Sequence, residues 1–132
     1  MRSEIRLGQG KMSREYIFRG KSKETGKWVY GSFLKFHGFQ IFDYTLNAWV
    51  SVDGHTIGQY TGVSDDRGNM IYEGDWITNP NNPYIGVGIV YFAQGAYYIR
   101  FTENNILPLD RVHSFWSEIM VVGNIIDENE GD

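Results

Sequence analysis

Three histidines are the residues of this chain best suited to acid–base chemistry, and they lie far apart, at His37, His55 and His113. Histidine changes charge near neutral pH, and a catalytic histidine usually needs a second group that orients it. Asp53, two residues before His55, could take that role. The same short stretch also has the composition of a solvated turn, because Asp and Gly are frequent in turns. A motif this weak predicts no catalytic residue, and we expect a protein that is not an enzyme.

Oxygen-bearing side chains gather between positions 65 and 75. They are Asp65, Asp66, Asn69, Glu73 and Asp75. Carboxylate and amide oxygens are the ligands that calcium and magnesium prefer, so a metal site is one interpretation of this cluster. Its spacing does not match a calcium-binding loop, and Arg67 adds a positive charge. We therefore expect a solvated hairpin turn, with no metal ion and no cofactor.

Basic and aromatic residues alternate near the N-terminus, a pattern that can hold phosphates and stack bases. The candidate nucleic-acid-binding residues are Arg14, Arg19, Lys21, Lys23, Lys27, Trp28 and Tyr30. The formal net charge of −4 opposes this reading, because an acidic protein repels a polyanion. Core aromatics beside a solvated basic edge would produce the same pattern. Nucleic-acid binding is therefore the alternative function.

The charges are distributed unevenly along the chain. Residues 1–37 hold nine of the twelve Lys and Arg and three of the sixteen Asp and Glu, which gives +6, and residues 38–132 carry −10. The two parts could attract one another within a chain or between copies. Folding could equally mix these charges over one surface.

Composition bounds the class of protein. A chain of 132 residues suits one domain, and with no cysteine it can form neither disulfides nor zinc–thiolate sites. No apolar run approaches the roughly 20 residues that span a bilayer, and the first residues lack the apolar core of a signal peptide. We expect a cytoplasmic protein that does not bind membranes.

Aromatics make up 16% of the residues, and many stand beside β-branched residues, as is typical of half-buried strands. Alternation and turn residues predict strands at Glu15–Arg19, Lys27–His37, Phe39–Tyr44, Ala48–Val52, Thr56–Tyr60, Met70–Tyr72, Trp76–Thr78, Gly86–Ala93, Gly95–Phe101 and Glu118–Ile126. Helical spacing of apolar residues allows one short helix near Asp110–Ser117.

Glycines and acids punctuate the middle of the chain and predict its reversals. The structural turn motif consists of Gly62, Asp65, Gly68, Glu73, Gly74 and Asp75. Asp side chains accept hydrogen bonds from nearby backbone amides, and glycine tolerates a left-handed backbone. These residues therefore look architectural.

The order of elements predicts an all-β protein, because many short strands are separated by turn residues and no βαβ units alternate. Residues 1–12 are expected to be a flexible leader, and residues 13–126 a single β domain. Residues 127–132 are expected to be a frayed acidic tail.

Several ordered segments resemble a known family. They are Phe18–Lys21, Gly26–Gly31, Thr56–Gly62 followed by Asp65, Gly68 and Ile71–Asp75, then Gly88–Phe92 and Val122–Ile125. Together they cover most of residues 14–129, and the chain resembles the YopX-like proteins of phages and prophages. It departs from that pattern in its leader and in the Pro-Asn-Asn-Pro loop at 80–83.

The resemblance implies a small β-barrel, SH3-like in the C-terminal part at about residues 56–126, with an additional N-terminal β-sheet region. It also implies a phage or prophage origin and a homo-oligomer, and it brings no catalytic residue. We expect a non-enzymatic binding or assembly module that self-associates or binds an unidentified phage or host protein in a bacterial cell. An enzyme would instead require a pocket that gathers His55 or the Asp65–Asp75 carboxylates.

Overall fold

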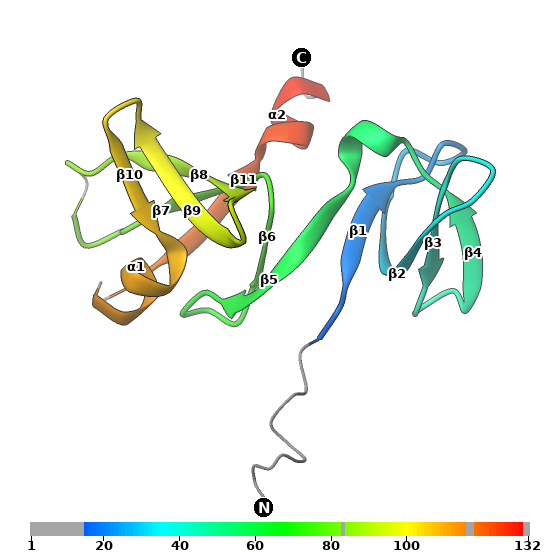
Figure 1. The fold of residues 1–132 in the computed structure, drawn as a ribbon, viewed down its shortest axis with the longest axis horizontal. Coiled ribbons are helices and arrows are strands. Elements are labelled where there is room, and N and C mark those ends of the chain that lie inside the picture. The colour runs from blue at the N-terminus through cyan, green and yellow to red at the C-terminus, as the bar shows by residue number, and fades with distance from the viewer. Residues whose placement is uncertain (1–14, 83, 116–117, 131–132) are drawn as a thin grey trace, which may run out of the picture.

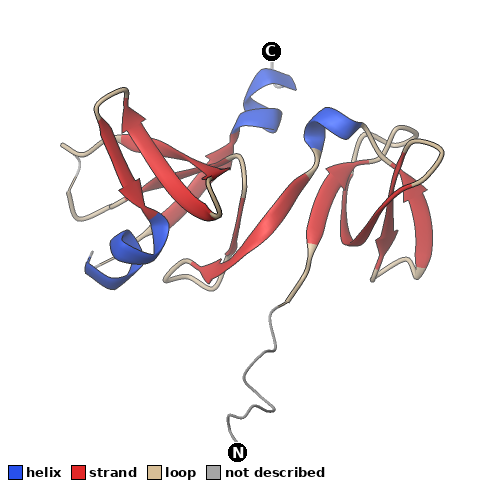
Figure 2. Cartoon of the chain, in the orientation of Figure 1, coloured by secondary structure: helices blue, strands red, loops and turns tan. Residues whose placement is uncertain are grey.

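Antiparallel strands make up most of the molecule. The computed structural model describes residues 15–82, 84–115 and 118–130. The elements run in the order β1 (Phe18–Lys21), β2 (Trp28–Lys35), β3 (Phe39–Asp43), β4 (Ala48–Ser51), the 3₁₀ helix η1 (Gly54–Thr56), β5 (Gly58–Ser64), β6 (Met70–Tyr72), β7 (Asp75–Thr78), β8 (Val87–Ala93), β9 (Ala96–Thr102), β10 (Asn105–Pro108), α1 (Leu109–Phe115), β11 (Met120–Asn124) and α2 (Ile125–Glu130). They form two sheets, with the N-terminal strands at one end of the molecule and β7–β10 at the other (Figure 1). The all-β prediction is confirmed, as the many strand arrows of Figure 2 show.

The first sheet has the strand order β4-β3-β2-β1-β5-β6. Ser22 and Val52 form an antiparallel bridge, and Lys23 N donates to Ser51 O over 2.9 Å, so the end of β4 returns to the end of β1. Strands β1 to β4 therefore wrap around a core of their own. That core consists of Val29, Ile41 and Val52, with Phe18, Phe33 and Phe39 packed against it.

The second sheet has the order β10-β9-β8-β7-β11 and is bent around a second core. This core takes residues from three sources: Ile77, Val90, Ile99 and Ile119 from the sheet and the chain just before β11, Leu109 and Val112 from α1, and Ile71 from β6. Strand β6 therefore pairs within the first sheet while its buried side chain packs into the second core. The two sheets are joined through β5 and β6.

The predicted C-terminal barrel takes the form of an open sheet. Strands β5 and β6, which begin the predicted barrel region, extend the N-terminal sheet instead. Within the described residues no ladder joins the edge strands β10 and β11. Helix α1 contacts β9 and β10 and buries Leu109 and Val112, so apolar side chains of a helix cover the core where the sheet does not close.

Two short α-helices are present where the sequence predicted at most one. The expected helix near Asp110–Ser117 corresponds to α1. The second, α2, replaces the predicted frayed tail from Asp127 onwards as far as the described residues extend. It begins after Asn124, whose Oδ1 accepts a hydrogen bond from Asp127 N over 2.7 Å, as an N-cap residue does. The predicted leader at 1–12 lies outside the described residues.

Candidate functional site

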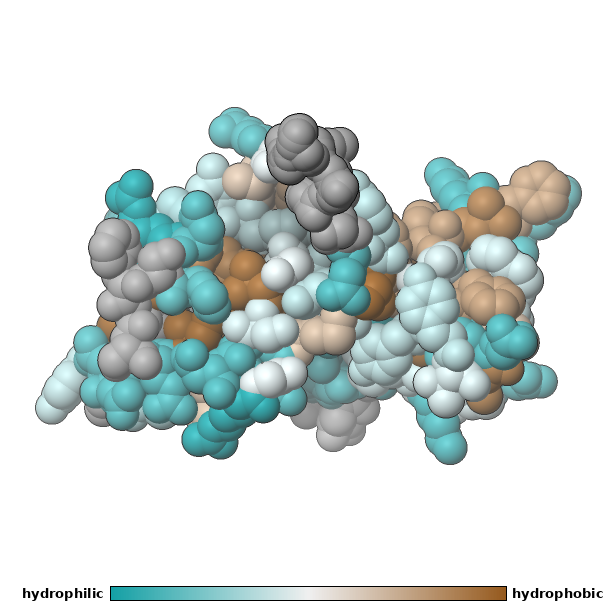
Figure 3. Space-filling model, turned by 90° about the horizontal axis from the view of Figure 1, so that it is seen from below, coloured by the Kyte–Doolittle hydropathy of each residue, from teal (hydrophilic) through white to brown (hydrophobic). Residues whose placement is uncertain are grey.

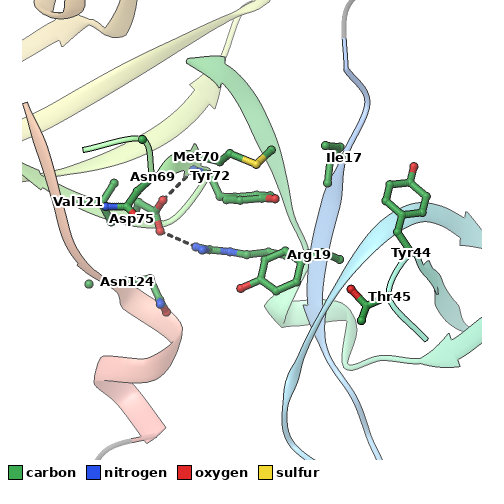
Figure 4. A pocket seen from close by; sticks show the side chains of 13 residues that line it. Ile17, Arg19, Tyr44, Thr45, Asn69, Met70, Tyr72, Asp75, Val121 and Asn124 are labelled. Carbon is green, nitrogen blue, oxygen red and sulfur yellow. Dashed lines mark hydrogen bonds and ion pairs between the residues drawn. The ribbon is translucent and has the colours of Figure 1, made fainter. Parts of the chain in front are cut away.

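A cleft of about 710 Å³ lies between the two sheets. Figure 4 shows residues from β1 and the β3–β4 turn on one side and residues from β6, β7 and β11 on the other. The lining residues are Ile17, Arg19, Tyr30, Tyr44, Thr45, Gly68, Asn69, Met70, Tyr72, Asp75, Val121, Gly123 and Asn124. Segments from the whole length of the chain therefore build this one site.

Arg19 lies at the base of the cleft and reaches from the first sheet to the second. Its Nη2 donates to Asp75 Oδ1 over 2.7 Å, and the two side chains are only 8% and 2% exposed. The guanidinium carbon lies 4.6 Å from the Trp28 ring centroid and 4.7 Å from that of Tyr72. An ion pair this deeply buried costs desolvation energy, which good geometry and contact with aromatic faces offset. Arg19 therefore acts as a joint between the sheets.

Asp75 is positioned by the reversal that precedes it. Gly74 takes a left-handed backbone, with φ of +89°, which glycine adopts without strain. This turn places Asp75 Oδ2 where it accepts a hydrogen bond from the Tyr72 amide over 2.7 Å, while Oδ1 accepts the hydrogen bond from Arg19 Nη2. Burial raises the pKa of Asp75, an effect that the Arg19 charge and the Tyr72 N–H oppose. Both carboxylate oxygens are thus occupied inside the chain.

Tyrosine rings form the walls of the cleft. Tyr30 and Tyr72 lie with ring centroids 5.8 Å apart, and the Tyr60 ring centroid lies at the same distance from that of Tyr72. Burial raises the pKa of Tyr30 and raises that of Tyr72 to about 12. These phenols therefore stay neutral at physiological pH, where they offer an apolar ring and a hydrogen-bonding hydroxyl.

The rim residues Tyr44 and Thr45 are held by Asp43. This carboxylate accepts hydrogen bonds from the amides of Tyr30, Thr45 and Leu46 at 2.7–3.0 Å. Burial raises the pKa of Asp43, but these three amides outweigh burial and lower it below the usual value. The β3–β4 turn is therefore fixed by an ionised Asp at neutral pH.

Asp65 fixes the opposite rim. It accepts hydrogen bonds from the amides of Arg67, Asn69 and Val121, and from the side-chain amide of Asn69. Burial raises the pKa of Asp65, but these donors outweigh burial and lower it. Asp66 similarly accepts from Ile119 N. The β5–β6 turn is thereby attached to β11 in the second sheet.

A second ion pair joins the first sheet to α2. Lys21 Nζ lies 2.6 Å from Asp127 Oδ1, and Trp28 Nε1 donates to Asp127 Oδ2 over 3.0 Å. Burial raises the pKa of Asp127, but hydrogen bonds from Lys21, Trp28 and Asn124 outweigh burial and lower it to about 2. The acidic end of the chain is therefore bound to the basic N-terminal strands.

This contact predicts an acid transition specific to α2. Because the folded pKa of Asp127 lies below its ordinary value of 3.8, its contribution to stability is complete above about pH 5 and is lost as the pH falls towards 2. The indole N–H signal of Trp28 in NMR spectra, identified by its loss in Trp28→Phe, should shift within that window. Asp127→Asn should abolish the shift. A Trp28 signal already displaced at pH 4 would contradict the contact.

Five of the six residues predicted as a turn motif lie at reversals, whereas Gly62 lies inside β5, where the pairing register with β6 shifts. Gly62 and Gly68 have φ of +88° and +85°, like Gly74. Glu73 Oε1 accepts from Gln59 N over 2.7 Å, which ties the β6–β7 turn to β5. With Asp65 and Asp75, these residues shape the backbone around the cleft.

The candidate nucleic-acid residues are divided by the fold. Arg19 and Lys21 form ion pairs within the chain, and Trp28 covers both of them as an aromatic face. Lys23 and Lys27 are exposed at the β1–β2 turn. Tyr30 lines the cleft, and Arg14 lies outside the described residues.

The chemistry considered for the histidines and acids is not assembled at one place. His37 lies in the β2–β3 turn, His55 in η1 and His113 in α1, and none of them lines the cleft. No group of three or more His, Asp or Glu in the described part of the chain is arranged to hold a metal ion. The carboxylates of Asp65, Asp66 and Asp75 bind backbone amides or Arg19 instead.

Sequence reasoning missed much of the cleft lining, namely Ile17, Tyr44, Thr45, Asn69, Met70, Val121, Gly123 and Asn124 as parts of one site. No spacing rule connects these positions, because tertiary packing alone brings them together. Asn124 did carry a readable signal, since Asn followed three residues later by Asp resembles a helix-capping pair.

None of the described helices has the length and apolar character that a membrane-spanning helix requires.

Comparison with known proteins gives one informative result. No curated protein matches the chain. A model of the YopX protein family matches residues 17–130, which include both sheets, the cleft and α2. Because this match spans most of the chain, the protein belongs to the YopX family.

Proposed function

We propose that this chain is a non-enzymatic binding and assembly module that self-associates, encoded by a phage or prophage and acting in the cytoplasm of the bacterial host. The observation that carries the proposal is the state of the charged groups in the cleft. Arg19 and Asp75 are paired with each other, and Asp65 and Asp43 at its rims bind backbone amides. An acid, base or nucleophile needs a group free to titrate or attack, and these groups are engaged in holding the fold.

What remains in the cleft suits binding. Neutral tyrosines provide rings and hydroxyls, Met70 and Val121 provide apolar contacts, and Asn69 provides an amide. Sites that bind without chemistry commonly combine such apolar and aromatic walls with a few polar groups. The ligand or protein partner would be encoded by the phage or by the host.

Self-association is supported by the apolar side chains that the folded chain leaves exposed. Large hydrophobic residues at the surface include Phe36 at 60%, Leu46 at 63% and Trp49 at 50% exposed. Contiguous exposed apolar surface in a protein of this size commonly marks an interaction site.

Light scattering coupled to gel filtration tests the proposal. At tens of micromolar, the full chain should elute with a mass of at least twice 15.2 kDa, at both low and high salt. Apolar contacts are screened little by salt, so the mass should persist at high salt. A chain that stays at 15.2 kDa under both conditions would reject self-association.

Nucleic-acid binding remains the alternative, and the same column can address it. Of its proposed cations, Arg19 and Lys21 are engaged with Asp75 and Asp127, which leaves Lys23 and Lys27 as exposed charges among the described residues. Two charges support little phosphate binding at physiological salt. Coelution with single-stranded DNA that is lost in Lys23→Glu/Lys27→Glu would favour the alternative.

A further inference from the structure

On the N-terminal sheet, the side of β2, β3 and β4 that faces away from their core carries no charge. The charges on the same side of β1, Arg19 and Lys21, are paired with Asp75 and Asp127. Side chains alternate along β2, β3 and β4, and one set faces the core with Val29, Ile41 and Val50. The other set, here called the outer face, consists of Ser32, Leu34, Gln40, Phe42, Tyr44, Trp49 and Ser51. Trp28 and Tyr30 lie on the same side nearer β1, where they contact Arg19 and Tyr72 of the same chain. In a chain of which 21% is charged, seven neighbouring uncharged residues stand out from the rest of the surface.

The strand register makes this face continuous. Ser32 pairs with Phe42 and Phe42 with Trp49, so these three side chains form one row across the sheet. The Phe42 and Trp49 rings touch edge to face with centroids 5.3 Å apart, and Ser32 Oγ lies 2.9 Å from Tyr44 OH. Leu34 begins the next row beside Gln40. The outer face is therefore a packed surface and not a set of isolated residues.

The area of the outer face approaches that of one side of a protein interface. Leu34, Tyr44 and Trp49 are 42%, 54% and 50% exposed, and the exposed Phe36 and Leu46 extend the face into its two flanking turns. Half-exposed side chains of this size contribute roughly 600 Å² in total. A stable interface buries about 800 Å² on each partner, which the polar neighbours of these residues would supply. The space-filling view shows brown and tan surface at the end formed by the N-terminal strands (Figure 3).

A second copy can hardly add a strand to either sheet, because the edge strands are short or already covered. The end of β4 is bridged by Ser22 and Lys23. At β11 the amides of Ile119 and Val121 already bind carboxylates of the β5–β6 turn. The other two edges, β6 and β10, have three and four residues. Many β proteins suppress edge-to-edge association in this way. A second copy would therefore bind to a face of a sheet.

We propose that the outer face is the surface on which a second copy of this chain binds, with the two N-terminal sheets packed face to face about a two-fold axis. Charge decides this occupant: each copy carries −4, so two copies repel over most of their surfaces. At the outer face they meet without burying an unpaired charge, and an isologous contact requires such a self-compatible patch. The inference rests on the self-association proposed above and names the surface for it.

A double variant, Leu34→Glu/Trp49→Glu, tests the surface. Both side chains point outward, so the fold should be retained, as circular dichroism can verify, while four carboxylates would be forced into the interface. The variant should elute at 15.2 kDa at a concentration where the native chain has at least twice that mass. The matched control Ile106→Glu/Val122→Glu places the same charges on the second sheet, where both residues are also exposed. Its mass should equal that of the native chain.

The outcomes separate this inference from the function it rests on. A native chain that is monomeric alone rejects self-association and this surface together, and cosedimentation with phosphatidylcholine vesicles would then assign the face to a lipid surface. A native oligomer whose mass is unchanged in the outer-face variant rejects the surface and leaves self-association standing. If the double variant is unfolded, Gln40→Glu adds charge to the same face without changing shape. It should weaken association at least about tenfold, and an unchanged dissociation constant would overturn the inference.

Discussion

Asp75→Ala is expected to lower the free energy of unfolding by about 3–5 kcal/mol, because it leaves the buried Arg19 without its counter-ion. The Arg19 and Asp75 side chains are 8% and 2% exposed and lie 2.7 Å apart. The variant also removes the acceptor of the Tyr72 amide, which begins the β6–β7 reversal. Urea unfolding followed by circular dichroism would measure the loss as a lower midpoint at an unchanged slope.

Asp53→Ala is the matched control for this experiment. Asp53 is also an aspartate beside a turn, but its side chain makes no capping hydrogen bond at η1. Its replacement should change the free energy of unfolding by less than about 0.5 kcal/mol, as for most surface positions. A loss for Asp75→Ala no greater than that of the control would show that the buried ion pair does not hold the sheets together.

Gly31→Ala is expected to cost at least about 3 kcal/mol, the upper range for overpacking a close contact. A Cβ added to Gly31 would lie 1.7 Å from the carbonyl oxygen of Phe42 and 2.9 Å from its carbonyl carbon. Both atoms belong to the backbone of β3, so relief requires that β3 move away from β2 and disturb the hydrogen bond from Tyr44 N to Tyr30 O. Thermal unfolding should show a melting temperature many degrees lower.

Gly26→Ala separates this steric effect from the loss of glycine itself. Gly26 has a φ of +72° in the β1–β2 turn, and an added Cβ would meet no atom within 4 Å. Its replacement should cost only the backbone strain of about 1–2 kcal/mol. If Gly31→Ala were no more destabilising than Gly26→Ala, the close approach of β2 and β3 would be refuted.

Local pattern was sufficient for most of the strands. The alternation in Lys27–His37 corresponds to β2, and the apolar triplet at Met70–Tyr72 is β6 with the same bounds. The reversal predicted around Asp65 and Gly68 followed from residue types that bind their own backbone, and Asp65 does accept hydrogen bonds from the Arg67 and Asn69 amides. These features depend on neighbours in sequence, which is why sequence reasoning reaches them.

Elements that depend on distant partners were missed. Strand β10 has the sequence Asn-Ile-Leu-Pro, which lacks apolar–polar alternation and ends in a proline, so local pattern did not predict it; pairing with β9 creates it. Helix α2 has few apolar residues, and the contact of Asp127 with Lys21 and Trp28 helps to hold it. The cleft was missed for the same reason, because its two walls come from different sheets and meet only in the folded chain.

The basic and acidic parts of the chain bind each other within one copy. The basic N-terminal part and the acidic remainder meet at Arg19–Asp75 and at Lys21–Asp127. This pairing weakens the prediction of a basic nucleic-acid surface, because two of its central cations are engaged. It also leaves the uncharged outer face as the surface that differs most from the rest of the protein.

A double-mutant cycle on Arg19 and Asp75 tests most directly whether the charges of the cleft hold the fold together. Unfolding free energies of Arg19→Met, Asp75→Ala and the combined variant should give a coupling energy of at least about 2 kcal/mol, with the combined variant more stable than the sum of the single losses predicts. Additive losses would contradict the account. They would show that Arg19 acts independently of Asp75 and would return it to the cations available for a ligand or a phosphate.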